Sequence, residues 1–192
     1  MNITSNSAAI DADFLNHIVE INRPAPEIAK ILSKILSALG VVAVIHPLVR
    51  EKEIKLQPDK VKHLLSNSVI LSPSFKDIFQ DDASKKDYYK LLVRELYRKL
   101  SGNILDTGDQ DVLTYWITGK SLGEVHSVSM CLICGCGIFL SDDNDSKYLK
   151  KIVEADRLGS IDVYDRKEIL NQIGREVLIR SERRAFERTI RE

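Results

Sequence analysis

The chain has 192 residues, of which 44% are hydrophobic, and its 28 lysine and arginine residues balance 28 aspartate and glutamate residues. A chain of this size can bury the core of one domain, and its neutral charge argues against strong non-specific binding to nucleic acids while leaving room for a local basic groove. No apolar run is long enough to span a bilayer, and residues 1–7 lack the features of a signal peptide, so we expect a cytoplasmic protein that does not contact a membrane.

Short apolar runs alternate with helical patterns along the chain. The runs predict strands at residues 8–10, 41–45, 69–71, 138–140 and 161–164. The patterns predict helices over residues 14–21, 27–39, 58–65, 88–100, 106–117, 121–134 and 148–153, with a short helix after Pro47 and another from Asp165 onward. This alternation predicts an α/β fold in which a parallel central sheet is flanked by helices.

Two segments depart from the alternation. Residues 72–117 contain helical patterns and no strand, and we expect them to form a helical insertion beside the sheet within a domain of residues 1–170. Residues 171–192 alternate arginine with glutamate, which predicts a charged C-terminal helical tail with a solvated, ion-paired face. Apolar residues on the other side of this tail could instead pack on a partner.

The three cysteines, Cys131, Cys134 and Cys136, lie close together. A structural zinc site needs four ligands, and the four histidines do not show the paired spacing of a zinc finger. Cys131 and Cys134 lie in an apolar run, where reduced cysteine packs as a small hydrophobic side chain. We therefore favour core packing over metal binding or redox chemistry.

Four acidic patches follow predicted strands or open predicted helices. They contain Asp11 and Asp13, Glu51 and Glu53, Glu124, and the three aspartates Asp142, Asp143 and Asp145. In parallel α/β sheets, ligands bind at the carboxyl ends of the strands, where the first and last patches are expected. Carboxylates gathered at one place repel one another and favour a hard divalent cation such as Mg²⁺ or Mn²⁺. Such a site suits phosphodiester hydrolysis.

Residues 9–15, with the sequence AIDADFL, resemble the opening of PIN-domain proteins, which begin with an apolar strand followed by Asp-x-Asn. PIN domains are a metal-dependent nuclease fold shared by many toxin ribonucleases of toxin–antitoxin pairs. The resemblance implies a three-layer α/β/α fold and makes Asp11 the first metal ligand, with Asp13 in place of the usual asparagine. Residues 46–53 resemble the family's strand–Pro–Val–Glu pattern, which implies a role for Glu53, with Glu51 as the alternative.

Residues 123–127 and 140–143 resemble a subgroup with Gly-Glu at a helix start and Asp-Asp after the next strand. This resemblance makes Glu124 the third ligand. Alignment of the family's Thr-x-Asp-x-Asp stretch favours Asp143, with Asp145 in support, and leaves Asp142 open. The implied catalytic set is Asp11, Glu53, Glu124 and Asp143. Ser141 would orient a ligand or the scissile phosphate.

Each patch also has a purely structural interpretation. Ser121 and Glu124 have the spacing of a capping box, and residues 142–145 could cap the helix that follows them. Glu51 and Glu53 lie among basic residues, as on a solvated helix face. Asp11 differs because a carboxylate directly after a buried strand is usually held by a partner. We favour a shared metal site because one site explains all four placements.

The resemblance implies a Mg²⁺- or Mn²⁺-dependent endoribonuclease that cleaves single-stranded or structured RNA and leaves 3′-hydroxyl and 5′-phosphate ends. Such an enzyme would act alone or as a toxin bound by an antitoxin. The alternative is a PIN-like binding or scaffold module that is catalytically inactive and acts through protein partners, and a homo-oligomer is open in both cases. Two basic groups are candidates for RNA contacts. The first is interleaved with tyrosines in residues 85–99 and consists of Lys86, Lys90, Arg94 and Arg98. The second lies in the C-terminal tail, where alternating glutamates favour ion pairing instead, and consists of Arg175, Arg180, Arg183, Arg184, Arg188 and Arg191.

Overall fold

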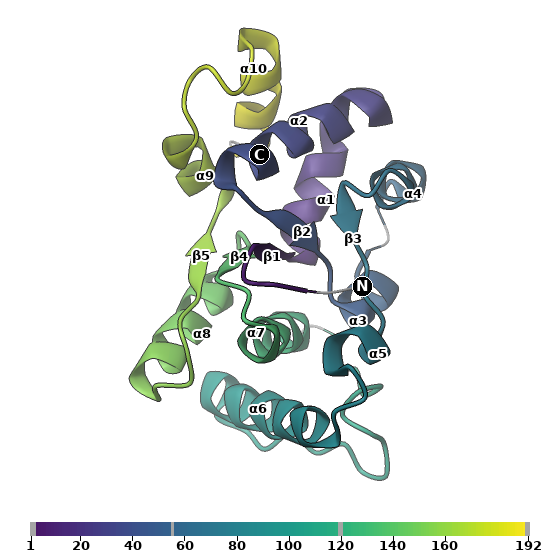
Figure 1. Cartoon of the computed structure of the whole chain (residues 1–192), viewed down its shortest axis with the longest axis vertical. Helices are drawn as coiled ribbons and strands as arrows, with labels where there is room; N and C mark the ends of the chain where they lie inside the picture. The colour runs from purple at the N-terminus through teal and green to yellow at the C-terminus, as the bar shows by residue number, and fades with distance from the viewer. Residues whose placement is uncertain (1–2, 55, 119–120, 191–192) are drawn as a thin grey trace.

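A parallel five-stranded sheet runs through the middle of the protein (Figure 1). The structure, a computed structural model, describes residues 3–54, 56–118 and 121–190. The strands are β1 (Ser7–Ile10), β2 (Val42–Val44), β3 (Ile70–Leu71), β4 (Ile138–Leu140) and β5 (Asp162–Tyr164). They lie in the order β3-β2-β1-β4-β5, and all neighbours are parallel. The five predicted strands are confirmed to within one residue at each end.

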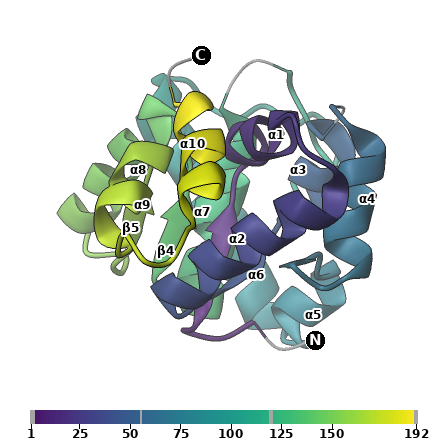
Figure 2. The same ribbon diagram turned by 90° about the horizontal axis from the view of Figure 1, so that it is seen from above.

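Helices cover both faces of the sheet. One face carries α1 (Ala12–Glu20), α2 (Ala25–Leu39), α4 (Pro58–Ser66), α9 (Arg166–Gln172) and α10 (Arg180–Arg188) (Figures 1 and 2). The other face carries α5 (Phe75–Phe79), α6 (Ala83–Ser101), α7 (Leu122–Cys134) and α8 (Asn144–Ala155). The short helix α3 (Pro47–Lys52) follows β2 and contacts α7. The fold is therefore a three-layer α/β/α sandwich.

Because successive side chains of a strand point to opposite faces of the sheet, the apolar side chains of the strands are divided between two cores. Ala8 and Ile10 of β1 belong to the core under α1 and α2, whereas Ala9 belongs to the core under α7. Every residue of β1 is buried, as expected for a central parallel strand covered on both faces. Cys131 and Cys136 are buried in the second core, and all three cysteines are free, which confirms the core-packing interpretation.

The expected insertion differs in part from the structure. Its main helix, α6, is present and packs on the outside of α7, so that α7 lies between α6 and the sheet (Figure 1). The predicted helix over residues 106–117 is wrong, because this segment consists of turns and irregular backbone. The side chains of Asp106 and Asp111 accept hydrogen bonds from the backbone N–H groups of Gly108 (2.9 Å) and Leu113 (3.0 Å). Aspartates that bond to the backbone two residues onward stabilise turns at the expense of a helix.

The C-terminal segment packs within the same chain. Phe186 of α10 is fully buried in the first core, and Glu182 forms an ion pair of 2.6 Å with Lys34 of α2. The apolar side that could have met a partner is therefore largely used internally. Residues 191 and 192 of the expected tail lie outside the described residues. None of the described helices combines the length and the apolar character needed to cross a membrane.

Replacing Phe186 with alanine tests whether α10 is part of the folded unit. Because the side chain is fully buried, we expect Phe186→Ala to lower the free energy of unfolding by about 3–5 kcal/mol, measured by urea denaturation. Ile179→Ala, at a side chain that is 60% exposed, is the control and should change it by less than about 0.5 kcal/mol. Equal stability of both variants would show that α10 does not contribute to the core.

Candidate active site

An acidic cleft of about 390 Å³ opens at the carboxyl ends of β1 and β4. Five carboxylates line it, from Asp11, Asp13, Glu53, Glu124 and Asp143. They come from the start of α1, the end of α3, the start of α7 and the start of α8. The fold thus brings together one or more acids from each of the four predicted patches.

Asp11 is the most buried of these acids, with 1% of its surface exposed. Its backbone N–H continues the sheet by donating to the carbonyl of Leu140 (2.9 Å), which fixes the residue between β1 and β4. The hydroxyl of Ser141 donates to one carboxylate oxygen (3.2 Å), while the other oxygen, Oδ1, is buried without a hydrogen-bond partner among the described residues. Burial, with smaller effects of the charges of Asp13 and Asp143, raises the pKa of Asp11 to about 7.

Glu124 approaches the same space from the first turn of α7. It is 9% exposed, and its Oε2 is also buried without a partner among the described residues. Burial raises its pKa to about 8, and the charges of Asp11, Glu53 and Asp143 act in the same direction. Two buried carboxylates, each with one unpartnered oxygen, are costly to ionise in one cleft, because their hydrogen bonds only partly offset the loss of solvation.

The carboxylate of Glu53 reaches the cleft by passing close to Gly123. A Cβ atom on Gly123 would lie 2.7 Å from Oε1 of Glu53, so only glycine at the start of α7 allows this carboxylate to approach. Burial raises the pKa of Glu53 to about 7, followed by the charges of Asp11 and Asp13. The Gly-Glu pair of the sequence therefore has two roles: Gly123 makes room for Glu53, and Glu124 supplies a further carboxylate.

Ser141 and Asp143 connect the cleft to the loop after β4. Ser141 is fully buried, and its Oγ accepts hydrogen bonds from the Asp143 backbone N–H (3.2 Å) and the Ser146 hydroxyl (2.8 Å). This leaves the Ser141 hydroxyl proton for Asp11, which orients the Asp11 carboxylate. Asp143 caps α8 by accepting from the Asp145 backbone N–H (2.8 Å), yet its side chain still lines the cleft.

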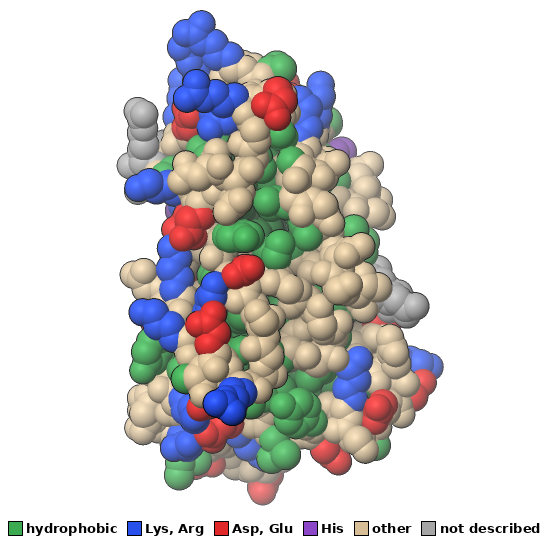
Figure 3. Space-filling model, turned by 60° about the vertical axis from the view of Figure 1, so that its left-hand side comes forward, with side chains coloured by type: hydrophobic (Ala, Val, Ile, Leu, Met, Phe, Trp, Pro, Cys, Tyr) green, Lys and Arg blue, Asp and Glu red, His purple; other side chains and the backbone are tan. Residues whose placement is uncertain are grey.

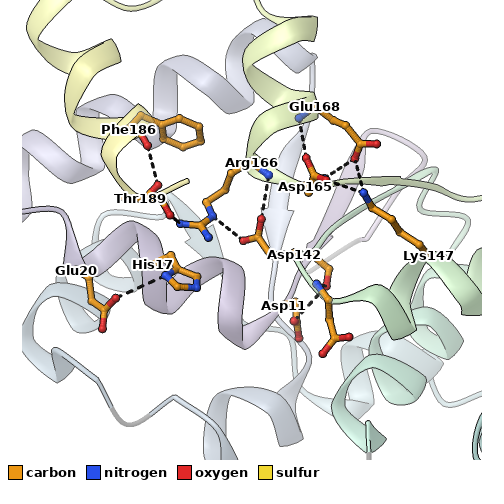
Figure 4. Close-up of polar contacts among 12 residues, drawn as sticks. Asp11, His17, Glu20, Asp142, Lys147, Asp165, Arg166, Glu168, Phe186 and Thr189 are labelled. Carbon is orange, nitrogen blue, oxygen red and sulfur yellow. Dashed lines mark hydrogen bonds and ion pairs between the residues drawn. The ribbon is translucent and has the colours of Figure 1, made fainter. Parts of the chain in front are cut away.

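Three predicted acids lie outside the cleft. Asp142 turns away and binds Arg166 through both oxygens, at 2.7 Å to Nε and 3.1 Å to the backbone N–H (Figure 4). Asp145 accepts a hydrogen bond from the hydroxyl of Ser121, and exposed Glu51 pairs with Lys52 Nζ at 2.6 Å. The structure therefore does not bring Asp142, Asp145 and Glu51, which were expected to bind or support the metal, into the lining of the cleft.

The structural interpretation of Glu124 also fails. Ser121 has a left-handed backbone (φ +49°), and its side chain does not cap α7, because its hydroxyl binds Asp145. The capping box suggested by the spacing is therefore absent, and this alternative does not explain the carboxylate of Glu124.

The basic residues proposed for RNA contacts lie elsewhere. None of Lys86, Lys90, Arg94 and Arg98 lines the cleft, because α6 packs on the far side of α7. Lys90 and Arg98 form ion pairs with Asp111 (2.8 Å) and Glu95 (2.7 Å), respectively. Tyr89 and Tyr97 are buried, so they cannot stack on bases, whereas Tyr88 is 47% exposed. The structure thus places the predicted basic residues away from the acidic cleft.

Several residues of the cleft lining were missed from the sequence, among them Asn16, Lys52 and Trp116. Asn16 lies on α1 one turn beyond Asp13, and its side-chain Oδ1 is buried without a partner among the described residues. The helical spacing from Asp13 could have revealed it. Lys52 precedes Glu53, and Trp116 reaches the cleft from the irregular segment before α7. The position of Trp116 depends on tertiary packing, and the sequence carried no local signal for it.

A buried chain of three polar side chains ties the cleft elements together. The phenol of Tyr89 on α6 hydrogen-bonds to His46 Nε2 (2.9 Å) and His126 Nδ1 (2.6 Å). His46 Nδ1 accepts from the Leu48 N–H (3.2 Å) at the start of α3. Burial lowers the pKa values of both histidines, that of His126 to about 3, so both are neutral. Neutral His46 then carries its proton on Nε2 and donates to Tyr89, which donates to His126. This chain fixes α3, which carries Glu53, against α7, which carries Glu124.

The cleft residues fit a divalent cation by their chemistry. Among the described residues, no three acidic, histidine or cysteine side chains form a preassembled ligand set. However, the unpartnered oxygens of Asp11 and Glu124 are hard donors of the kind Mg²⁺ and Mn²⁺ prefer. A cation beside them would also offset the burial and the smaller charge repulsion that raise the pKa values of these acids.

In comparisons with known proteins, no protein-family model, curated protein or solved structure matches the chain. The resemblance to PIN-domain proteins therefore depends on the short motifs of this sequence, and the function is argued from the site.

The buried acids predict an unusual dependence of stability on pH. The pKa of Asp11 rises from 3.8 to about 7 on folding, so its contribution to the free energy of unfolding falls as pH increases between these values and is constant above them. Asparagine cannot ionise, so the melting temperature of Asp11→Asn relative to wild type should rise between pH 4 and pH 7 in EDTA. Because both proteins contain the same histidines, the difference reports the Asp11 carboxyl group together with its effect on the pKa values of Glu53 and Glu124. A difference that does not change with pH would contradict the raised pKa.

Substitutions of Asp142 and Asp143 should have opposite effects: one should lower stability, and the other should weaken metal binding. Asp142→Ala leaves the buried guanidinium of Arg166 without its carboxylate, so we expect a loss of about 3 kcal/mol in the free energy of unfolding. The affinity of the Asp142→Ala protein for Mn²⁺, measured by calorimetry on the folded protein, should equal that of wild type. Asp143→Asn keeps a good helix cap and should weaken Mn²⁺ binding with little loss of stability. The reverse pattern would show that Asp142 is the ligand.

Proposed function

We propose that the protein is a metal-dependent nuclease that hydrolyses phosphodiester bonds of RNA in the acidic cleft. The observation that carries the proposal is the pair of buried, unpartnered carboxylate oxygens on Asp11 and Glu124, which face one cleft together with Glu53 and Asp143. A purely structural role would leave these oxygens uncompensated, at a cost to folding.

Each cleft residue has a defined part in this proposal. Asp11 and Glu124 would hold the cation, with Glu53 and Asp143 beside them, and Ser141 keeps the Asp11 carboxylate oriented through its hydrogen bond. When bound, Mg²⁺ or Mn²⁺ lowers the pKa of a coordinated water and neutralises charge on the phosphate oxygens. Lys52 at the cleft edge contributes positive charge toward a phosphate.

Trp116 favours a nucleic acid over a smaller phosphodiester. Its indole lies beside the acids and is stacked near the ring of His126, with a centroid separation of 6.4 Å and an interplanar angle of 12°. Together with Ile117 it forms an apolar wall, and aromatic side chains next to a phosphate site suit the stacking of an unpaired base. The choice of RNA over DNA follows from the resemblance of residues 9–15 to PIN-domain ribonucleases.

The test combines metal binding with cleavage. Wild type should bind Mn²⁺ and cut single-stranded RNA of mixed sequence, leaving 5′-phosphate ends. Glu53→Gln should lower the cleavage rate by at least about tenfold, equivalent to about 1.4 kcal/mol. Glu154→Gln on α8 is the matched control, because it removes the same charge from an exposed side chain that does not line the cleft, and it should behave as wild type.

Two results would contradict the proposal. Equal loss of cleavage in both glutamate variants would place the activity outside this cleft. Tight Mn²⁺ binding without cleavage of RNA or DNA would instead support the inactive binding or scaffold module.

A further inference from the structure

A second cavity, of about 470 Å³, lies where α10 passes the end of α1. Its lining includes Arg23, Arg184 and Arg188, with Asn22 and Ser181 as polar neighbours and Glu20 as the one acid. We refer to it as the arginine groove. Figure 2 shows α10 beside α1, and in Figure 3 lysine and arginine side chains gather at the end of the molecule that α10 occupies.

The charges of α10 divide into two faces. Arg183 pairs with Glu187 at 3.3 Å, and Glu182 pairs with Lys34, so these side chains neutralise one another. Arg184 and Arg188, one helical turn apart, point into the groove and form no ion pair with any described residue. The sequence predicted that the charged residues of this helix form ion pairs with one another. Among the described residues, this holds for Arg183 but not for the two arginines that line the groove.

The other charges of the groove leave it basic. Arg23 pairs with Glu27 at 2.7 Å, and Glu20 lies 3.6 Å from His17 Nδ1. Among the described residues, the guanidinium groups of Arg184 and Arg188 are thus without an ion pair, and Glu20 is the one carboxylate of the lining. Arginine binds phosphate oxygens in a planar, two-pronged geometry, which makes such a cavity suited to a phosphate group.

A buried arginine fixes the groove relative to the acidic cleft. Arg166 binds Asp142 on one side and donates to the backbone carbonyl of Thr189 on the other (Figure 4). Asp142 directly precedes Asp143, which lines the acidic cleft, and Thr189 lines the arginine groove. The two cavities are thus held together by one side chain that is only 7% exposed.

Helix α1 connects the two cavities along one of its faces. Asp13 and Asn16 line the acidic cleft, and Glu20, one turn beyond Asn16, lines the arginine groove. The nine residues of α1 span about 13 Å at a rise of about 1.5 Å per residue. One small anion cannot occupy both sites at this separation, whereas a chain with regularly repeated phosphates can.

We infer that the arginine groove binds the phosphate backbone of the single-stranded RNA whose scissile bond lies in the acidic cleft, a few nucleotides along the strand. This inference rests on the proposed function and extends it to the path of the substrate. An acidic protein segment would also satisfy the arginines, but the rigid link to a phosphodiester-cleaving cleft favours the nucleic acid.

The test measures RNA binding without cleavage. A fluorescently labelled single-stranded RNA is titrated in EDTA with wild type and with the double variant Arg184→Gln, Arg188→Gln. We expect about tenfold weaker binding at low salt, and a plot of log affinity against log salt whose slope is smaller by about 1.4, since two phosphate contacts are lost. Arg94→Gln removes an exposed arginine on α6 and is the matched control, with binding within about twofold of wild type.

The outcomes separate this inference from the proposed function. Unchanged RNA affinity and salt slope in the double variant, equal weakening by Arg94→Gln, or no RNA binding by wild type would overturn it. So would arginine-dependent binding of an acidic peptide that exceeds binding of the RNA. Mn²⁺ affinity should be the same in wild type and the double variant. If wild type does not bind Mn²⁺ but binds RNA through these arginines, the result contradicts the proposed metal site and not RNA binding by the arginine groove.

Discussion

The burial of the Asp11 carboxylate is the constraint on which the candidate site depends. The residue directly follows the central strand, and its backbone continues the sheet hydrogen bonding to β4, so it cannot move toward solvent without breaking the ladder. One oxygen has Ser141 as its partner, and the other has none among the described residues. Glu53, Glu124 and Asp143 then add like charges to the same cleft. Carboxylates with pKa values raised in this way inside a cleft are typical of functional sites.

The surrounding structure holds the acids in place against their repulsion. Gly123 leaves space that the Glu53 carboxylate fills, and the chain from His46 through Tyr89 to His126 locks α3 to α7. Because Tyr89 comes from α6, the segment that looked like an insertion supports the elements of the cleft from behind. Arg166 does the same on the other side, where it joins the loop after β4 to the C-terminal segment.

The sequence predicted what local patterns encode. The five strands were found because each is a short apolar run bounded by turn residues, and Asp11, Glu53, Glu124 and Asp143 were found because acids at strand ends and helix starts are conspicuous. The sequence could not separate Asp142 from Asp143, because the difference depends on Arg166, which arrives after the next strand. The turns of residues 106–117 were missed because aspartates that cap turns also occur at helix starts. The position of Trp116 in the cleft and the existence of the arginine groove depend on packing between segments distant in sequence, which local periodicity does not reveal.

We propose that the unpartnered oxygens of Asp11 and Glu124 bind a cation, and anomalous X-ray scattering from crystals of the wild-type protein soaked in Mn²⁺ would locate it. We expect an anomalous peak in the acidic cleft, about 2.0–2.2 Å from carboxylate oxygens of Asp11 and Glu124, by analogy with the Mg²⁺–oxygen distance of about 2.0–2.1 Å. No peak in the cleft at saturating Mn²⁺, or a peak at the Asp142 and Asp145 carboxylates instead, would contradict it.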